Sequence, residues 1–207
     1  MTGDPDGVDE DKRATLRRFA ALGAASPLAR FADEDAVDGA DSSDARDAIA
    51  GYLSTTPGAH FSKIRDDLSL GTGETQHHLR RLVEAGAVES FRDGEYRRYV
   101  PADRFGPFEK RALGYLRRST PRGMVVALLR DPTASGSDLA DALSVSRPTV
   151  SKYAKELEEA GLLSRSDGYT LERPEALLTL LVRYAHSFGP AAAAVADDAD
   201  SLIRYDP

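Results

Sequence analysis

The chain of 207 residues contains no cysteine, which excludes disulfide bonds, thiolate metal sites and cysteine nucleophiles. No apolar run approaches the roughly 20 residues that a membrane-spanning helix needs, so we expect no membrane partner.

Lysine is scarce: five lysines stand beside 22 arginines, while 22 aspartates stand beside 12 glutamates. Low lysine with abundant aspartate resembles the proteins of halophilic archaea, and a GC-rich genome alone would give part of the arginine bias.

A pattern of helix, turn, helix, strand, Asp-Gly and strand occurs twice, about 75 residues apart. The longer helix of each copy stops at an Ala-Gly pair, at Gly86 and at Gly161, as expected for a left-handed C-cap. Asp93-Gly94 and Asp167-Gly168 follow as hairpin signals. This order is that of a winged helix-turn-helix, whose second helix has the dimensions to enter a DNA major groove.

Apolar periodicity and turn residues predict the individual elements. Helices are expected over Ser43–Thr55, Phe61–Leu68, Thr72–Ala85, Phe108–Arg118, from Thr120 and Pro121 onward, Ser137–Leu143, Ser146–Ala160 and Pro174–Phe188. Strands are expected over Ala87–Arg92, Tyr96–Pro101, Leu162–Arg165 and Tyr169–Leu171. The fold class is therefore mainly α with small β-wings, as two tandem winged helix-turn-helix domains plus a C-terminal helix.

This pattern divides the chain into five parts. Residues 1–42 form an acidic, partly disordered segment with a short helix, and residues 43–103 form the first winged helix-turn-helix domain. Residues 104–119 are expected to be a connecting helix, residues 120–172 the second domain, and residues 173–207 a C-terminal helix and tail.

The N-terminal segment allows two interpretations. Residues 1–13 are rich in Asp, Gly and Glu, which predicts disorder. Arg17-Arg18 before a mild apolar run resembles a twin-arginine secretion signal, but Pro27 and Arg30 cut that run short. The alternative is a short amphipathic helix that packs on the body or on a second subunit. Residues 32–44 are interpreted as a linker.

Charge is distributed unevenly along the chain. Its net charge is −7, with residues 1–44 and 131–207 each at −6 and residues 45–130 at +5. Because the middle third carries the first helix-turn-helix copy, we expect that copy to contact nucleic acid and the second to have a different role. In a salt-filled cell such contacts would depend on base recognition and shape, since the Debye length at 1 M salt is about 3 Å.

The stretch from Ser144 to Leu163 resembles the recognition helix of MarR- and ArsR-type prokaryotic regulators. His60-Phe61-Ser62-Lys63-Ile64, followed by Gln76-His77-His78-Leu79-Arg80-Arg81-Leu82, is similar to archaeal winged-helix regulators. The resemblance covers roughly residues 43–101 and 120–172. It implies transcriptional regulation by binding of operator DNA, usually as a dimer, and we place such a protein in the cytoplasm.

Candidate contacts with double-stranded DNA follow from the residue types on the first copy. Glutamine pairs with adenine and arginine with guanine or phosphate, while wing residues suit phosphate or minor-groove contact. Gly71, Gly73 and the helix N-terminus offer amides to a phosphate. An ordinary solvated helix face is the alternative. The candidates are Thr72, Gln76, His77, Arg80 and Arg81 on the helix, and Arg92, Tyr96, Arg97 and Arg98 on the wing.

The second copy offers a weaker set of contacts. Glu156, Glu158, Glu159 and acidic surroundings oppose DNA binding there, and the short wing adds only Arg165. DNA contact and a dimerising or scaffolding role both remain open for this copy. Its candidate contacts are Arg147, Thr149, Ser151, Lys152 and Lys155.

The C-terminal helix carries apolar residues on more than one face, which requires more than one partner surface. We expect a homodimer through this helix, and the alternative is packing across both domains of one chain. The residues concerned are Leu177, Leu178, Leu180, Leu181, Val182 and Tyr184.

Catalytic and cofactor signatures are not found in the sequence. Gly71-Thr72-Gly73 lacks the strand, the further glycine and the lysine of a phosphate loop. His77 and His78 point to two helix faces, which makes a poor chelate. We therefore expect no enzyme, no cofactor and no metal. Two hypotheses remain: a sequence-specific regulator, and a tandem winged-helix protein-interaction module of the transcription or chromosome-organising machinery.

Overall fold

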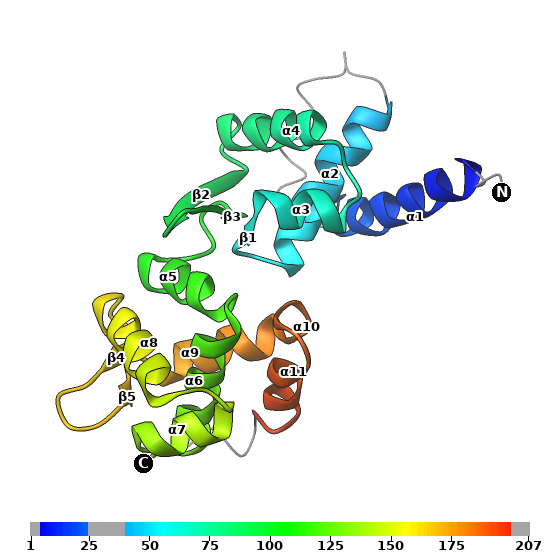
Figure 1. Ribbon diagram of the computed structural model, residues 1–207. Helices are drawn as coiled ribbons and strands as arrows, with labels where there is room; N and C mark the ends of the chain where they lie inside the picture. The colour runs from blue at the N-terminus through cyan, green and yellow to red at the C-terminus, as the bar shows by residue number, and fades with distance from the viewer. Residues whose placement is uncertain (1–4, 25–39, 200–207) are drawn as a thin grey trace. The chain divides into compact units, whose positions relative to one another are not determined.

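The computed structural model describes residues 5–24 and 40–199 (Figure 1). The chain divides into two compact units, unit 1 over residues 1–105 and unit 2 over residues 106–207. The predicted fold class is confirmed, because each unit contains a helix-turn-helix followed by a small antiparallel sheet. No described helix is both long and apolar enough to cross a membrane.

Unit 1 is a helix-turn-helix with a three-stranded antiparallel sheet in the order β1-β3-β2. The second helix of the motif, α4, begins after Gly71 and ends at Glu84. Ala85 is its C-cap, and Gly86 follows with a φ of +70° that favours glycine. The elements are α1 (Pro5–Ala24), α2 (Ala40–Thr55), β1 (Ala59–His60), α3 (Phe61–Asp67), α4 (Thr72–Glu84), β2 (Val88–Asp93) and β3 (Tyr96–Pro101).

The core of unit 1 forms where the apolar faces of its helices meet. Ile49 and Leu53 of α2, one helical turn apart, are fully buried together with Ile64 of α3. Leu79 and Leu82 of α4 join the same cluster. Full burial of an aliphatic side chain stabilises the fold by about 1.5–3 kcal/mol, so this cluster fixes how α4 is presented.

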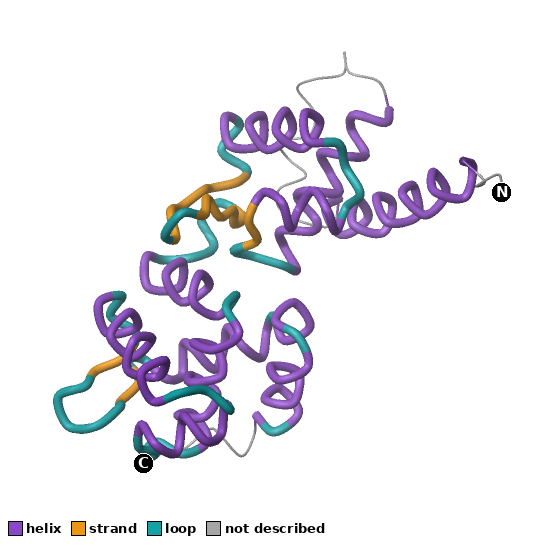
Figure 2. Tube along the Cα trace, viewed as in Figure 1, coloured by secondary structure: helices purple, strands orange, loops and turns teal. Residues whose placement is uncertain are grey.

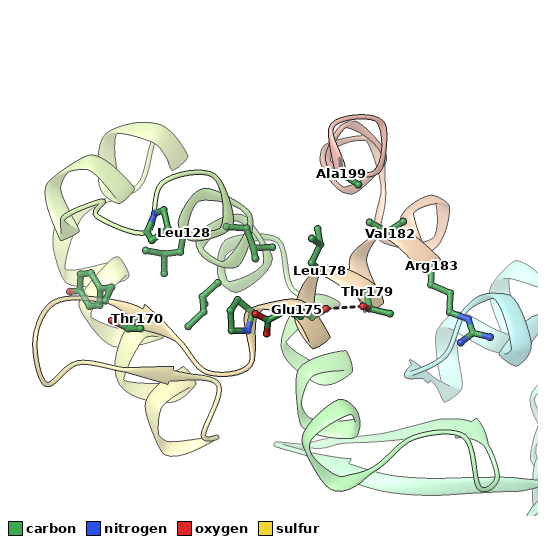
Figure 3. Close-up of a pocket in the computed structure, with 13 residues that line it drawn as sticks. Leu128, Thr170, Glu175, Leu178, Thr179, Val182, Arg183 and Ala199 are labelled. Carbon is green, nitrogen blue, oxygen red and sulfur yellow. Dashed lines mark hydrogen bonds between the residues drawn. The ribbon is translucent and has the colours of Figure 1, made fainter. Parts of the chain in front are cut away.

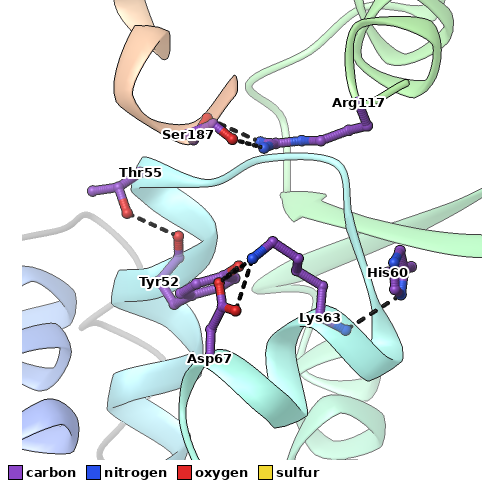
Figure 4. Close-up of polar contacts among 7 residues, drawn as sticks. All are labelled: Tyr52, Thr55, His60, Lys63, Asp67, Arg117 and Ser187. Carbon is purple, nitrogen blue, oxygen red and sulfur yellow. Dashed lines mark hydrogen bonds and ion pairs between the residues drawn. The ribbon is translucent and has the colours of Figure 1, made fainter. Parts of the chain in front are cut away.

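Polar contacts tie α3 to α2. The Tyr52 hydroxyl donates to Asp67 at 2.8 Å, and the Lys63 ammonium donates to the same carboxylate at 2.7 Å (Figure 4). The His60 ring caps α3 by accepting from the Lys63 amide at 3.3 Å. Helix α3, the first helix of the helix-turn-helix, is therefore held by Tyr52 of α2 and by His60 of β1.

The N-terminal prediction is wrong for residues 5–13, which belong to helix α1 and are not disordered. Leu16 is buried in the core of unit 1, and the Phe19 ring meets the Tyr52 ring edge-on at 5.4 Å. This packing agrees with the amphipathic-helix interpretation of the twin-arginine segment. Residues 1–4, and the part of the expected linker before Ala40, lie outside the described residues.

Unit 2 repeats the motif and adds helices on both sides of it. Figure 2 shows the contrast between the long hairpin of unit 1 and the two short strands of unit 2. Gly161 takes the position of Gly86, with a φ of +67°. The elements are α5 (Pro107–Leu116), α6 (Ser119–Arg130), α7 (Gly136–Leu143), α8 (Arg147–Glu159), β4 (Leu163–Ser164), β5 (Thr170–Leu171), α9 (Pro174–Arg183), α10 (Ala185–Phe188) and α11 (Pro190–Asp197).

The helix expected to connect the domains is α5, which lies in unit 2 and packs on α6 and α9. One prediction for the helices of this unit needs correction. The expected long C-terminal helix is broken at Tyr184, whose backbone (φ −117°, ψ 24°) is not helical. α9, α10 and α11 fold back on one another, and so the chain itself covers much of the apolar surface of α9.

Candidate nucleic-acid interface

Helix α4 turns one face to the core and the other to solvent. Thr75, His78, Leu79 and Leu82 are buried. Of the predicted DNA contacts, Thr72, Gln76 and Arg80 are exposed and His77 and Arg81 are half-buried. Thr72, Gln76 and Arg80 recur every four residues, so they lie along one side of the helix, where they can reach base edges.

At the N-terminus of α4, a carboxylate already accepts the hydrogen bond of the cap residue, Gly71. Glu74 accepts a hydrogen bond from the Gly71 amide at 3.1 Å, and Lys12 of α1 lies 3.6 Å from the same carboxylate. The expectation that the Gly71 amide is available to a phosphate is therefore wrong. The sequence signal for this cap is glutamate three residues after the cap position; nothing in the sequence links Lys12 to it.

The wing of unit 1 places two arginines face to face. Arg92 of β2 and Arg97 of β3 are cross-strand partners, and both are exposed. Arg97 donates to the Ser90 hydroxyl at 2.9 Å and stacks over the Tyr99 ring at 5.6 Å. The wing therefore holds two guanidinium groups on one side of the hairpin, one of them oriented by its neighbours.

Arg98 is not available as a DNA contact, and that prediction is wrong. Its side chain is buried, donates to Asp93 at 2.6 Å and donates to the Gly58 carbonyl at 2.9 Å. Strand alternation explains the difference, because neighbouring residues of β3 point to opposite faces. Arg98 joins the wing to the turn before β1.

Tyr96 stands at the tip of the wing with 52% of its surface exposed. Its ring lies 5.1 Å from the His60 ring and 5.5 Å from the Arg98 guanidinium. The predicted contact is therefore accessible, and it is held by one residue from β1 and one from β3.

Arg65 of α3 is a basic residue near α4 that the sequence reasoning missed. Its guanidinium lies 3.5 Å from the Thr72 hydroxyl at the start of α4, and it pairs with Asp66 at 2.7 Å. Its position seven residues before Thr72 gives no periodic signal, because a turn separates the two helices.

Helix α8 also exposes its candidate residues, but its lysines have acidic partners. Arg147, Ser151, Lys152 and Lys155 are exposed, and Thr149 is half-buried. The two lysines pair with Glu156 and Glu159 one turn further along, at 3.9 and 3.7 Å. Arg147 donates to the Ser137 hydroxyl at 2.7 Å. Acids therefore offset much of the positive charge on this face.

The short wing of unit 2 is held by an exposed ion pair. Arg165 donates to Glu158 at 2.7 Å through Nε, and its amide donates to the same carboxylate at 3.2 Å. The hydrogen bond from Arg165 holds the pKa of Glu158 below its usual value, and the same bond raises the pKa of Arg165. This arginine is committed to holding the wing.

The net positive charge of the middle third belongs to unit 2. Residues 45–105 hold nine basic and nine acidic side chains, whereas residues 106–130 hold six basic and one acidic. Since unit 2 begins at Gly106, the expectation that the first helix-turn-helix is the basic one is wrong. The excess lies on α5, α6 and the residues that join them.

Three of those arginines serve the fold of unit 2. Arg111 donates to the Ala160 carbonyl at the end of α8 at 2.7 Å, and Arg122 donates to the Leu116 carbonyl at the end of α5 at 2.9 Å. Arg117 donates to the Ser187 carbonyl of α10 at 2.6 Å (Figure 4). Cations are favoured at helix C-termini, where carbonyls lack partners. Burial lowers the pKa of Arg122.

Metal binding finds no support in the part of the chain that the structure describes. No group of three or more potential ligands gathers among residues 5–24 and 40–199. The His77 and His78 rings are 5.2 Å apart and nearly perpendicular, so they do not converge on one point.

Comparison with protein families identifies both motifs. A family model described as an N-terminal helix-turn-helix domain matches residues 43–113, and a model of a Crp-like helix-turn-helix domain matches residues 111–180. No curated protein and no solved structure matches the chain significantly. The chain is thus a tandem helix-turn-helix protein, and its two domains support a general role as a DNA-binding regulator. The narrower resemblance to MarR- and ArsR-type regulators stays a prediction.

Proposed function

We propose that this protein is a sequence-specific transcriptional regulator that binds promoter or operator DNA mainly through unit 1. The observation that carries the proposal is the arginine pair on the wing. Like charges in directly opposite positions destabilise an antiparallel strand pair, yet Arg92 and Arg97 are exposed there and neither pairs with a carboxylate among the described residues. A DNA phosphate beside the two guanidinium groups would relieve their repulsion.

Helix α4 supplies the sequence recognition in this proposal. Gln76 is exposed in the first half of the helix, where recognition helices approach base edges, and a glutamine can bind adenine through two hydrogen bonds. Arg80 lies one turn further along and is largely exposed. Its guanidinium is 3.9 Å from the Glu84 carboxylate, which makes a weak ion pair. It can exchange that weak ion pair for guanine or phosphate.

Unit 2 takes the smaller part in DNA binding. Lys152, Lys155 and Arg165 each have a glutamate partner, so a phosphate contact there must first displace a carboxylate. The ion pairs of these three residues, rather than the net charge of each unit, are therefore the reason to assign DNA binding mainly to unit 1. The proposal involves no catalysis and places the protein in the cytoplasm, where it meets DNA.

The experiment measures binding to the gene's own upstream region by fluorescence anisotropy over a range of salt. Loss of two phosphate contacts in Arg92→Ala/Arg97→Ala should reduce the slope of log K against log salt by about 1.8. Lys152→Ala/Lys155→Ala also removes two positive charges and should change the slope less. Equal slopes for the wild type and the wing variant would contradict the assignment of the wing.

A second arm of the same experiment tests base recognition. Gln76→Ala should weaken binding to the specific sequence by about five- to 150-fold and leave binding to unrelated DNA unchanged, since one bidentate contact discriminates by about 1–3 kcal/mol. A wild-type chain that prefers no DNA sequence at any salt would refute the regulator and favour a protein-interaction module.

We also propose that the protein comes from a halophilic archaeon. Its scarce lysine and abundant aspartate support this origin. The salt titration provides the test: specific binding should persist at roughly 1 M salt, where the Debye length is only about 3 Å, because base contacts then contribute most of the affinity. Loss of all specific binding well below that salt would argue for a low-salt host.

A further inference from the structure

Unit 2 contains an open apolar cavity of about 640 Å³ beside α9 (Figure 3). The buried members of its lining are all leucines, namely Leu128, Leu129 and Leu178. Its polar members are side chains at the rim that are exposed or partly exposed. Small-molecule sites orient their ligands with a few convergent polar groups, and no buried polar group is available here to do so.

The outer edge of α9 carries a short row of exposed residues along this cavity. Glu175, Thr179 and Arg183 follow one another at intervals of four residues, so they lie along one side of the helix. Val182 lies beside them and is 37% exposed, the one large hydrophobic side chain of the described part of unit 2 with so much surface in water. Figure 3 shows Glu175 and Arg183 at opposite ends of this row.

The charges of the row are complementary to the same row in reverse. Glu175 and Arg183 are eight residues apart, about 12 Å along the helix axis. Neither makes an ion pair with any described residue. When two copies of α9 lie antiparallel, with a two-fold axis at Thr179, Glu175 of each copy faces Arg183 of the other. Such self-complementarity is what an isologous interface of a homodimer requires.

We propose that this row, Glu175, Thr179, Val182 and Arg183, is the docking site of a second copy of the chain. Two symmetric ion pairs flank the contact, and Val182 with the mouth of the cavity supplies its apolar centre. The expected homodimer thereby gains a register and named contacts. The proposal does not depend on DNA binding, so either can fail without the other.

The test is the dimer dissociation constant, measured by light scattering and analytical ultracentrifugation of the full chain at about 0.1 M salt, where screening is moderate. Glu175→Arg and Arg183→Glu should each weaken the dimer roughly tenfold, because each change turns both attractive pairs into repulsive ones. The double variant Glu175→Arg/Arg183→Glu restores opposite charges in the reversed order and should recover the wild-type constant within about twofold.

Two further variants complete the experiment. Asp141→Arg on α7 makes the same charge change away from the row and should leave the dimer intact, whereas Val182→Asp should abolish it at any salt. Circular dichroism of each variant is the folding control. We expect every variant to be folded, because the altered side chains are exposed.

Three results would overturn the proposal. The first is a wild-type chain that is monomeric at about 100 µM. The second is a double charge variant that is no tighter than the single variants. The third is a monomer whose cavity binds the apolar dye anilinonaphthalene sulfonate in a manner abolished by Val182→Asp, which would assign the cavity to a small apolar ligand.

Discussion

The two wings differ in what holds them to their helix-turn-helix. In unit 1 the strands are six residues long, β1 adds a third strand, and the Arg98–Asp93 ion pair that anchors the wing is only 4% and 9% exposed. In unit 2 the strands are two residues long, and the Arg165–Glu158 pair is 35% and 38% exposed. The wing of unit 1 is therefore held by a buried ion pair, and the wing of unit 2 by an ion pair at the surface.

Arginine use differs between the units in the same direction. Unit 1 leaves Arg92 and Arg97 exposed on its wing, whereas unit 2 directs Arg111 and Arg122 to carbonyls at helix ends. The number of basic residues in a segment therefore does not tell how many of them stabilise the fold itself. Arg111 and Arg122 already bind carbonyl oxygens, whereas neither Arg92 nor Arg97 pairs with a carboxylate among the described residues.

The largest effect should come from the buried anchor. Arg98→Ala removes the ion pair with Asp93 and the hydrogen bond to Gly58. Loss of one partner of a buried pair costs about 3–5 kcal/mol, so unit 1 should unfold at markedly lower denaturant. Urea unfolding followed by circular dichroism measures the shift.

Arg165→Ala is the matched control, since it removes an arginine–carboxylate pair from the other wing. Its effect on the unfolding of unit 2 should be far smaller, because water solvates Glu158 once the arginine is gone. Equal destabilisation by the two substitutions would remove the distinction between the wings.

A smaller effect is expected where an arginine of unit 2 caps a helix. Arg111→Ala removes the hydrogen bond to the Ala160 carbonyl at the end of α8 and should cost about 1 kcal/mol. Thermal unfolding of unit 2 measures this loss. The salt slope of DNA binding should stay unchanged; a fall of about 0.9 would show that this arginine contacts phosphate.

The smallest effect concerns pH and the wing of unit 2. Because the pKa of folded Glu158 is lowered by Arg165, ionised Glu158 stabilises the fold above its ordinary value of 4.5. That stabilisation is lost as pH falls through the lowered pKa. Asp138, whose pKa is lowered by hydrogen bonds from Ser135, titrates in the same acidic range, so the readout must be local.

The amide chemical shift of Arg165 is a suitable local readout, because this amide donates to Glu158. The shift should change as pH falls below about 4.5, and Glu158→Gln should remove the change. A titration that survives in Glu158→Gln would mean that another group controls the wing.

Much of the fold was predictable because its signals are local. Gly86 and Gly161 adopt the positive φ that ends α4 and α8, and the helices of both motifs begin and end within about three residues of the positions expected from apolar periodicity. The core residues Leu79 and Leu157 are buried as their helical spacing predicts.

The errors arose where the partner of a residue is distant in sequence. In the sequence, Arg98 looks like one more exposed arginine of the wing. Its partner Gly58 lies 40 residues earlier, so no local pattern indicates their contact. Arg111 likewise looks like an unpaired positive charge, but it donates to the Ala160 carbonyl at the end of α8, 49 residues later. The break at Tyr184 has no glycine or proline to announce it. Composition counts charges, but tertiary structure decides which of them already have a partner within the fold.

The buried anchor of the first wing also has a consequence for the thermodynamics of association. Ordering one residue's backbone costs about 1–2 kcal/mol of conformational entropy. For β2 and β3 this entropy is lost when the chain folds, because Arg98 and β1 already hold the hairpin. In the proposed complex this preordered wing would meet DNA without a further ordering penalty, as in any preorganised receptor. The hairpin of β4 and β5, with strands of two residues and an exposed ion pair, lacks such a buried anchor.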